Sequence, residues 1–423
     1  ALSLPQSDAI LPAMTQQVTR RHVFYIPGFD PVPPRAYRER YRREAARQAA
    51  LSGYEIDRGT APKGARFGWG VRARIEGAEV DARFELLSWA DIVQAGMRGG
   101  IVSGYLALAR TAWAYIGSGA LFRLMRLRKG PVIAALYPVV VLLAQLALAL
   151  AAGVVAAAVA ARLLGPVLPP VADAALRLAM VIGAAWPILR WFQRRDHLYA
   201  WYLVKDYAFS SRLHGAYPPE QEDRMRRFAD RIAAALASDV DEVLVVGHSS
   251  GAYIAVSVLA DLLRDGRVPA GGPALSLLTL GQVVPMVSFL PRATRLRADL
   301  AFLGSASVPW VDVTAPGDGC AFALCDPVAV SGVAAEGKRW PLVISAAFTR
   351  TLRPETLATL RWRLFELHFQ YLNAFDNLPG RADDYDYIRI TAGPLTLGTR
   401  FAGRAPSKSR IETPVNRHRG ITA

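Results

Sequence analysis

The amino-acid sequence predicts an α/β protein with a mostly parallel sheet, helices on both faces and an inserted transmembrane helical hairpin. Short apolar runs alternate with helix-like segments on both sides of the chain's middle, as in sheets built from β–α units. One apolar run joins a helix-like run through Gly-x-Ser-x-Gly at residues 247–251. Between the two halves, residues 131–161 contain no charged side chain and are long enough to cross a bilayer.

The first part of the α/β domain is expected at residues 21–95, after an N-terminal extension at 1–20. The extension lacks the charge-first, apolar-core order of a signal peptide, so we expect the internal hairpin to direct the chain to the membrane. Apolar alternation and charge patterning predict three strands and one helix in this part, at 22–26, 66–75, 79–87 and 36–51 respectively.

A membrane-associated insertion is expected at residues 96–216, with transmembrane helices at about 131–161 and 171–192. Gly-Pro-Val-Leu-Pro-Pro at 165–170 supplies the turn between them. Basic residues flank the hairpin on both sides and the turn carries little charge. The positive-inside bias therefore predicts an integral inner-membrane protein with its α/β domain facing the cytoplasm. A buried hairpin in a soluble core, or one span followed by a re-entrant segment, is the alternative.

Residues 97–127 precede the hairpin and are apolar, but Arg110, Gly117 and Gly119 interrupt them. Their Leu- and Arg-rich end predicts a segment on the membrane surface, with arginine head groups among the lipid headgroups. A lid helix over a site is the alternative, and the two roles are compatible.

The second part of the α/β domain is expected at residues 217–402, followed by a flexible basic tail at 403–423. Helices are predicted on either side of the Gly-x-Ser-x-Gly strand, at 219–237 and 252–263. Further strands are expected at 276–280, 310–314 and 342–347, with helical segments within 292–303 and 354–373.

The chain carries a formal net charge of +15, with 50 Lys and Arg against 35 Asp and Glu. The excess gathers beside the predicted spans and in the tail without a nucleic-acid motif. We therefore expect a bilayer with anionic headgroups as the partner, and no nucleic acid. Two cysteines, Cys320 and Cys325, are too few for a disulfide framework or a four-cysteine zinc site. No cofactor and no metal are expected, and the oligomeric state stays open.

Ser249 is the candidate nucleophile. A serine on a sharp strand-to-helix turn exposes its Oγ above the sheet, and the turn needs neighbours without side chains, here Gly247 and Gly251. The five-residue pattern also occurs by chance, so the prediction depends on the flanking strand and helix. The alternative is a glycine-rich turn in which Ser249 is only a polar cap.

Over residues 21–89 and 219–378, the chain resembles the α/β-hydrolase fold. The resemblance rests on the Gly-x-Ser-x-Gly turn and on the early strand that ends in Pro27-Gly28-Phe29. It implies an acyl-transferring serine hydrolase, usually an esterase or lipase, that uses no metal. The large apolar insertion departs from the common pattern of that fold and bears on the substrate.

Elimination among the six histidines leaves His368 as the candidate base. His248 adjoins Ser249 in a tight turn, where successive side chains diverge, so its ring cannot reach the Ser249 Oγ. The others lie at the start of the first strand, in the basic membrane flank, in a polar loop and in the tail. A histidine packed between aromatic residues in a helix is the alternative reading of His368.

Asp318 falls just past a predicted strand, at the carboxyl end where the chemistry of such sheets gathers, and is the candidate acid. Asp326 and Asp312 are the alternatives. Asp318 and His368 then follow Ser249 in the family's Ser, Asp, His order. The same resemblance implies an oxyanion hole made of the backbone N–H groups of Ser250 and Phe29.

The sequence therefore predicts a membrane-anchored serine hydrolase that cleaves acyl esters, with lipid or long-chain esters as the favoured substrates. Ser249 would attack the acyl carbonyl, His368 would transfer the proton and Asp318 would orient the ring. An acyltransferase or thioesterase on the same fold is one alternative. A catalytically idle, membrane-bound scaffold or binding module is another.

Overall fold

An eight-stranded, mostly parallel sheet forms the centre of the computed structural model, which describes residues 17–164, 167–361, 363–376 and 385–422. The strand order is β2-β3-β4-β1-β5-β6-β7-β8. All neighbours from β4 to β8 in that order pair in parallel, whereas β2/β3 and β3/β4 are antiparallel. The predicted α/β class with a mostly parallel sheet is confirmed. The strands are β1 (Arg20–Ile26), β2 (Glu55–Gly59), β3 (Gly68–Ile75), β4 (Ala78–Leu86), β5 (Glu242–His248), β6 (Ala274–Leu280), β7 (Trp310–Thr314) and β8 (Leu342–Ser345).

Strand β2 is the one strand that the sequence analysis misses. Its residues, Glu-Ile-Asp-Arg-Gly, carry three charged side chains, and it lies at the edge of the sheet. An edge strand needs no buried face, so it lacks the apolar alternation that marks the other strands. Its pairing with β3, in which Ile56 lies opposite Ala73, is what makes it a strand.

Two hydrophobic cores fill the two faces of the sheet. Along β5, Val243 and Val245 face one core while Leu244 and Val246 face the other, and all four are fully buried. Burying each such side chain contributes about 1.5–3 kcal/mol, so both faces hold β5 in place. The first core includes α8 (Pro219–Leu236), α9 (Gly251–Arg264) and α11 (Thr294–Ser305), and the second α1 (Pro34–Ser52), α16 (Tyr387–Ala392) and α17 (Leu397–Phe401).

The helical stretch expected within 354–373 is broken into three short elements. These are α14 (Pro354–Leu360), α15 (Leu364–His368) and the 3₁₀ helix η2 (Gln370–Leu372). The break puts His368 at the end of a short helix, from which its ring enters the protein interior.

Residues 403–422, part of the tail that is expected to be flexible, contact the body at several points. The backbone of Ile411 bonds to Leu324 and Asp326 on either side of a bridge to Cys325. The Asn416 side chain is buried and donates to two backbone carbonyls of the body. Backbone and amide hydrogen bonds hold this segment together with the side chains of Ile411 and Val415, which pack against a buried hydrophobic cluster of the body.

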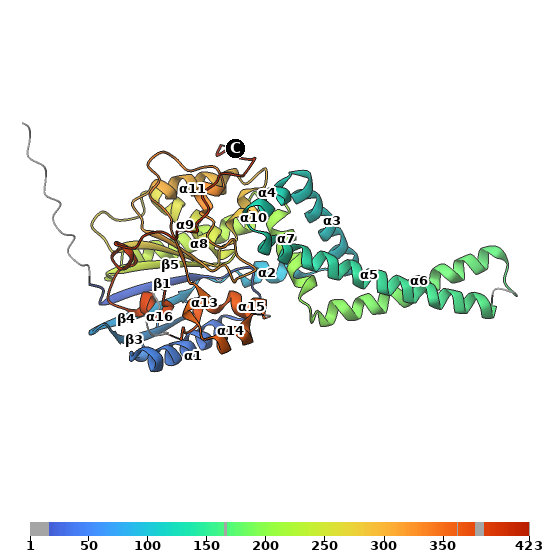
Figure 1. The fold of residues 1–423 in the computed structure, drawn as a ribbon, viewed down its shortest axis with the longest axis horizontal. Coiled ribbons are helices and arrows are strands. Elements are labelled where there is room, and N and C mark those ends of the chain that lie inside the picture. Colours follow the sequence, from blue (N-terminus) through green and yellow to red (C-terminus); the bar gives the residue numbers. More distant parts are fainter. Residues whose placement is uncertain (1–16, 165–166, 362, 377–384, 423) are drawn as a thin grey trace, which may run out of the picture.

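The insertion between β4 and α8 forms a helical arm, and its two long helices project from the α/β body (Figure 1). Helices α5 and α6 have 36 and 26 residues, about 54 and 39 Å at 1.5 Å per residue. Both are long and apolar enough to cross a membrane by length and composition. The helices of the insertion are α2 (Ala90–Met97), α3 (Ile101–Gly117), α4 (Ala120–Leu127), α5 (Lys129–Leu164), α6 (Pro170–Arg195) and α7 (Ala200–Ser211).

Apolar side chains cover the outside of this hairpin. Val140, Val155 and Leu178 are each more than half exposed. A hairpin in the core of a soluble protein buries such residues, so these faces disfavour that alternative. The aromatic residues near the end of the hairpin differ in their exposure to solvent. Trp191 is exposed, whereas Trp201 is buried and donates a hydrogen bond to Gln145 of α5 at 3.1 Å.

Candidate functional site

The turn from β5 into α9 holds Ser249 at a φ of 56°, in the left-handed region that side chains rarely adopt. The two glycines of the turn, Gly247 and Gly251, have no room for a side chain. A Cβ on Gly247 would lie 2.7 Å from the backbone of α9, and one on Gly251 would lie 2.1 Å from a carbonyl oxygen of β1. Across the turn, a Cβ on Gly28 would lie 2.9 Å from the Ser249 Cβ. Backbone strain of this kind costs about 1–3 kcal/mol and persists where the surrounding packing imposes it.

Asp318 and His368 meet in the protein interior. The His368 Nδ1 and the Asp318 Oδ2 lie 2.7 Å apart, and both side chains are buried. The Asp318 carboxylate also accepts from the Tyr371 hydroxyl at 3.0 Å and from the Cys320 backbone N–H at 2.9 Å. These bonds fix the carboxylate, which accepts the Nδ1 proton and leaves Nε2 as the acceptor nitrogen of a neutral ring.

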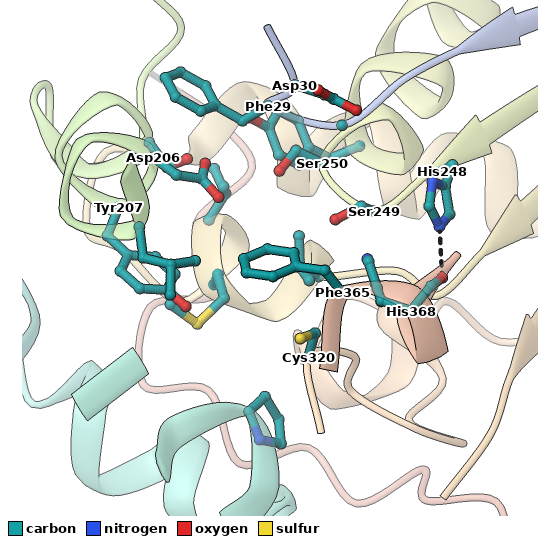
Figure 2. Close-up of a pocket in the computed structure, with 18 of the residues that line it drawn as sticks. Phe29, Asp30, Asp206, Tyr207, His248, Ser249, Ser250, Cys320, Phe365 and His368 are labelled. Carbon is teal, nitrogen blue, oxygen red and sulfur yellow. Dashed lines mark hydrogen bonds between the residues drawn. The ribbon is translucent and has the colours of Figure 1, made fainter. Parts of the chain in front are cut away.

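The other ring nitrogen of His368 faces Ser249 across a cavity (Figure 2). This buried Nε2 has no hydrogen-bond partner among the described residues. Gly281 makes room for the ring: its φ is 52°, and a Cβ there would lie 3.0 Å from the His368 Cε1. The structure thus brings His368, at the end of α15, into contact with Asp318 in the loop after β7, and places His368 at the same cavity as Ser249 in the turn after β5.

The His248 ring points away from the Ser249 hydroxyl. Its Nε2 lies 3.1 Å from the His368 carbonyl oxygen, which can only accept, so Nε2 carries the proton. Its Nδ1 then accepts from the Tyr25 hydroxyl at 3.0 Å. Burial holds the pKa of His248 well below the usual value, so this ring stays neutral. His248 thus supports the backbone of His368, the contact drawn as a dashed line in Figure 2.

Neither of the other two carboxylates reaches His368. Asp326 caps α12 (Pro327–Val330) and forms an ion pair with Lys338 at 2.6 Å. Asp312 lies inside β7 and accepts from the Thr279 hydroxyl at 2.6 Å. Both have structural partners of their own, whereas Asp318 is the carboxylate in contact with the imidazole.

The backbone N–H groups of Phe29 and Ser250 have no acceptor among the described residues. Both residues line the cavity beside Ser249, so these donors are available to a ligand there. The Phe29 loop is held firmly: its ring packs edge-on against Trp89 at 5.8 Å, and its carbonyl accepts from the Tyr202 hydroxyl. Two fixed donors beside a serine are the geometry that stabilises an oxyanion.

Helix α7 adds residues that the sequence analysis does not find. Tyr202, Asp206 and Tyr207 line the cavity. Figure 2 shows Asp206 and Tyr207 on the wall opposite His368. Burial raises the pKa of the Asp206 carboxyl to about 7, and nearby His368 partly opposes that shift. These residues fall within the membrane-associated insertion expected at 96–216, and no sequence signal connects them with Ser249.

One group of potential metal ligands occurs among the described residues: Asp318, Cys320 and His368. The donor atoms of Asp318 and His368 are already bonded to each other. Burial raises the pKa of the Cys320 thiol above its ordinary value, which disfavours the thiolate that binds metals. The arrangement of this group suits a hydrogen-bonded acid and imidazole better than a metal centre.

Ser249 and His368 line one cavity of about 90 Å³, and Asp318 bonds to His368 from behind it. A serine hydroxyl, an imidazole and a carboxylate arranged in this way can together transfer an acyl group. The serine supplies the oxygen, the imidazole accepts its proton, and the carboxylate holds the imidazole. No protein-family model, curated protein or solved structure matches the chain.

Proposed function

We propose that this protein is a serine hydrolase of the α/β-hydrolase type, anchored in a membrane, that cleaves acyl esters. The single observation behind the proposal is that His368, bonded to Asp318 through Nδ1, has its unpaired Nε2 at the cavity that Ser249 also lines. The strained turn at Ser249 and the two free backbone donors beside it support the same reading.

In the proposed reaction, the Ser249 Oγ attacks the ester carbonyl carbon while the His368 Nε2 takes the hydroxyl proton. The carbonyl oxygen becomes negative and accepts from the N–H groups of Phe29 and Ser250. When the carbon–oxygen bond breaks, His368 returns the proton to the departing alcohol and Ser249 keeps the acyl group. Water then attacks the acyl carbon while His368 takes a proton from it. The bond to the Ser249 Oγ breaks, His368 returns the proton to Ser249, and the carboxylic acid leaves. A fluorophosphonate, which modifies nucleophilic serines, tests the scheme: labelling must map to Ser249 and must stop ester hydrolysis.

An apolar cavity of about 120 Å³ adjoins the Ser249 cavity and supports a long acyl chain as part of the substrate. The two cavities share Tyr115, Tyr207 and Met286 on their walls. The second is lined by helices of the insertion, including Val132, Ala135, Leu136 and Val139 at the start of α5. A chain bound there would lie between Ser249 and the hairpin. Each buried CH₂ would contribute about 0.8 kcal/mol.

We expect the hairpin to matter for bilayer substrates and not for soluble ones. Intact enzyme in nanodiscs should cleave both a short butyrate ester and a long-chain ester held in the bilayer. Replacing residues 140–186 with a short polar linker should reduce only the long-chain activity, because extraction of the chain into water costs about 0.8 kcal/mol per CH₂. This variant keeps the start of α5, which lines the cavities.

A variant of equal length in which the same residues are replaced by another apolar hairpin serves as the control. It should retain long-chain activity. Equal loss of both activities in the linker variant would show that the hairpin supports the pocket, and full long-chain activity would contradict a bilayer substrate.

For the topology, we propose that both soluble parts lie on the cytoplasmic side. Exposed basic residues occur at both body-proximal ends of the hairpin, among them Arg126, Lys129, Arg194 and Arg195. Reporters fused to the two ends of the chain should therefore both read cytoplasmic. Ends on opposite sides would exclude the hairpin topology.

A further inference from the structure

The Ser249 cavity carries acidic side chains in a protein whose formal net charge is +15. The described residues that line it include the carboxyls of Asp30 and Asp206, and no lysine or arginine. A phosphate or carboxylate group bound beside the reacting bond would need a cationic or equivalent donor partner. The charge of this cavity thus opposes the charge of the protein as a whole, and it disfavours an anionic group next to Ser249.

The two acids differ in their partners. Asp30 accepts from the Tyr37 hydroxyl at 2.6 Å and from the Val32 backbone N–H at 2.8 Å, so its carboxyl serves the loop. Asp206 accepts no hydrogen bond and forms no ion pair within the described parts of the chain. Figure 2 shows its carboxyl group projecting into the cavity between Phe29 and Tyr207. A carboxyl left without a partner in a part-buried cavity is suited to a partner that arrives with the ligand.

Aromatic rings line the cavity into which this carboxyl projects. Phe29, Tyr202 and Phe365 form a connected row, with ring centroids 6.3 Å and 5.9 Å apart, and Tyr207 lies on the same wall. The only lining ring with a protein cation over it, in the described residues, is Phe369, which Arg40 covers at 4.6 Å. Ring faces attract cations within about 6 Å of their centroids, most strongly where water is excluded.

We propose that the cavity selects acyl substrates whose leaving group carries an ammonium or quaternary ammonium, held by Asp206 and by the rings of Phe29, Tyr202, Tyr207 and Phe365. This substrate class rests on the proposed ester hydrolysis, because the kinetic test below requires that the enzyme cleave esters. The chemistry is that of a cation placed between one carboxylate and several aromatic faces. The acyl part would still occupy the apolar cavity beside α5.

The selection should depend on pH. Burial raises the pKa of Asp206 to about 7, and a bound cation favours the ionised form, so binding strengthens as pH rises through that value. The titratable groups that line the cavity with Asp206, among the described residues, are Asp30, His248, His368, the Cys320 thiol and four phenols, those of Tyr115, Tyr202, Tyr207 and Tyr253. Burial raises the pKa of the thiol and of each phenol, which keeps all five neutral near pH 7.

The test compares butyrylcholine with 3,3-dimethylbutyl butyrate, in which a carbon atom replaces the charged nitrogen. Wild-type enzyme should prefer the choline ester in kcat/KM. Asp206→Asn should lower kcat/KM for the choline ester by about 10-fold to 100-fold and change the neutral ester by less than about threefold. Asp265→Asn, which removes one exposed carboxylate elsewhere, should leave both values unchanged. An unchanged ratio of the two esters in Asp206→Asn, or an equal loss on both, would overturn the inference.

A binding measurement separates this inference from the proposed hydrolysis. If wild-type enzyme cleaves neither ester, the hydrolysis proposal fails, and calorimetry with choline and its neutral analogue 3,3-dimethylbutan-1-ol still decides the charge preference. Choline should bind more tightly than the analogue, more so at about pH 8 than at about pH 6, and lose this advantage in Asp206→Asn. Equal binding of the two alcohols would overturn the cation site.

Discussion

The Ser249→Ala variant is expected to lose about 10⁶ in kcat on any ester that the wild-type protein cleaves, because no other atom can form the acyl-enzyme. It should also lose all labelling by a fluorophosphonate. The fold should persist, since the substitution removes one oxygen atom and places no new atom against Gly28, the residue that passes closest to Ser249. Thermal unfolding within about 2 °C of wild type, measured by circular dichroism, would show that the loss is chemical.

Ser305→Ala provides the matched control, because Ser305 is exposed at the end of α11 on another part of the surface. It should keep full labelling and full activity. Continued labelling of a folded Ser249→Ala protein would place the nucleophile elsewhere. Absence of labelling in the wild type would favour an idle scaffold over an enzyme.

The two partners of Ser249 should differ in the size of their effects. His368→Ala removes the proposed base and should cost about 10⁶ in kcat, as much as loss of the serine itself. Asp318→Asn should cost about 10⁴. An amide NH₂ in place of the carboxylate forces the His368 Nδ1 to accept, which moves the ring proton to Nε2 and blocks transfer from Ser249.

Asp326→Asn is the comparison for this pair. Asp326 is buried in the same part of the chain but pairs with Lys338, so its substitution should lower the free energy of unfolding by about 3–5 kcal/mol and leave kcat near wild type. Kinetics at saturating substrate and chemical denaturation measure the two effects. A crippled Asp326→Asn together with an active Asp318→Asn would reverse the assignment of the acid.

Local patterns in the sequence were sufficient to predict the position of Ser249. The apolar strand, the glycines on either side of the serine and the following helix lie within one short stretch of the chain. The close approach of neighbouring backbone, which leaves no room for a Cβ, explains why each glycine is needed. Order along the chain also led to His368 and Asp318. Only the folded structure brings their side chains to 2.7 Å, because 50 residues separate them and the contact depends on how α15 enters the interior.

Elements without a local signal depended on tertiary contacts. Strand β2 is polar because it lies at an edge, and its partner strand decides its conformation. The tail is held by hydrogen bonds to the body, which composition does not report. By sequence, Asp206 is a charged residue within the expected membrane-associated insertion, and only the fold places it at the cavity that Phe29 and Ser249 line.

The sequence by itself therefore determined the α/β class, the two long apolar helices and the serine turn, since each is written in the periodicity or steric needs of adjacent residues. Tertiary structure decided which carboxylate meets the imidazole, which backbone donors stay free and what lines the cavity. These depend on residues far apart in the chain, such as Phe29, Asp206 and His368, and their approach is set by packing of the whole sheet and its insertion.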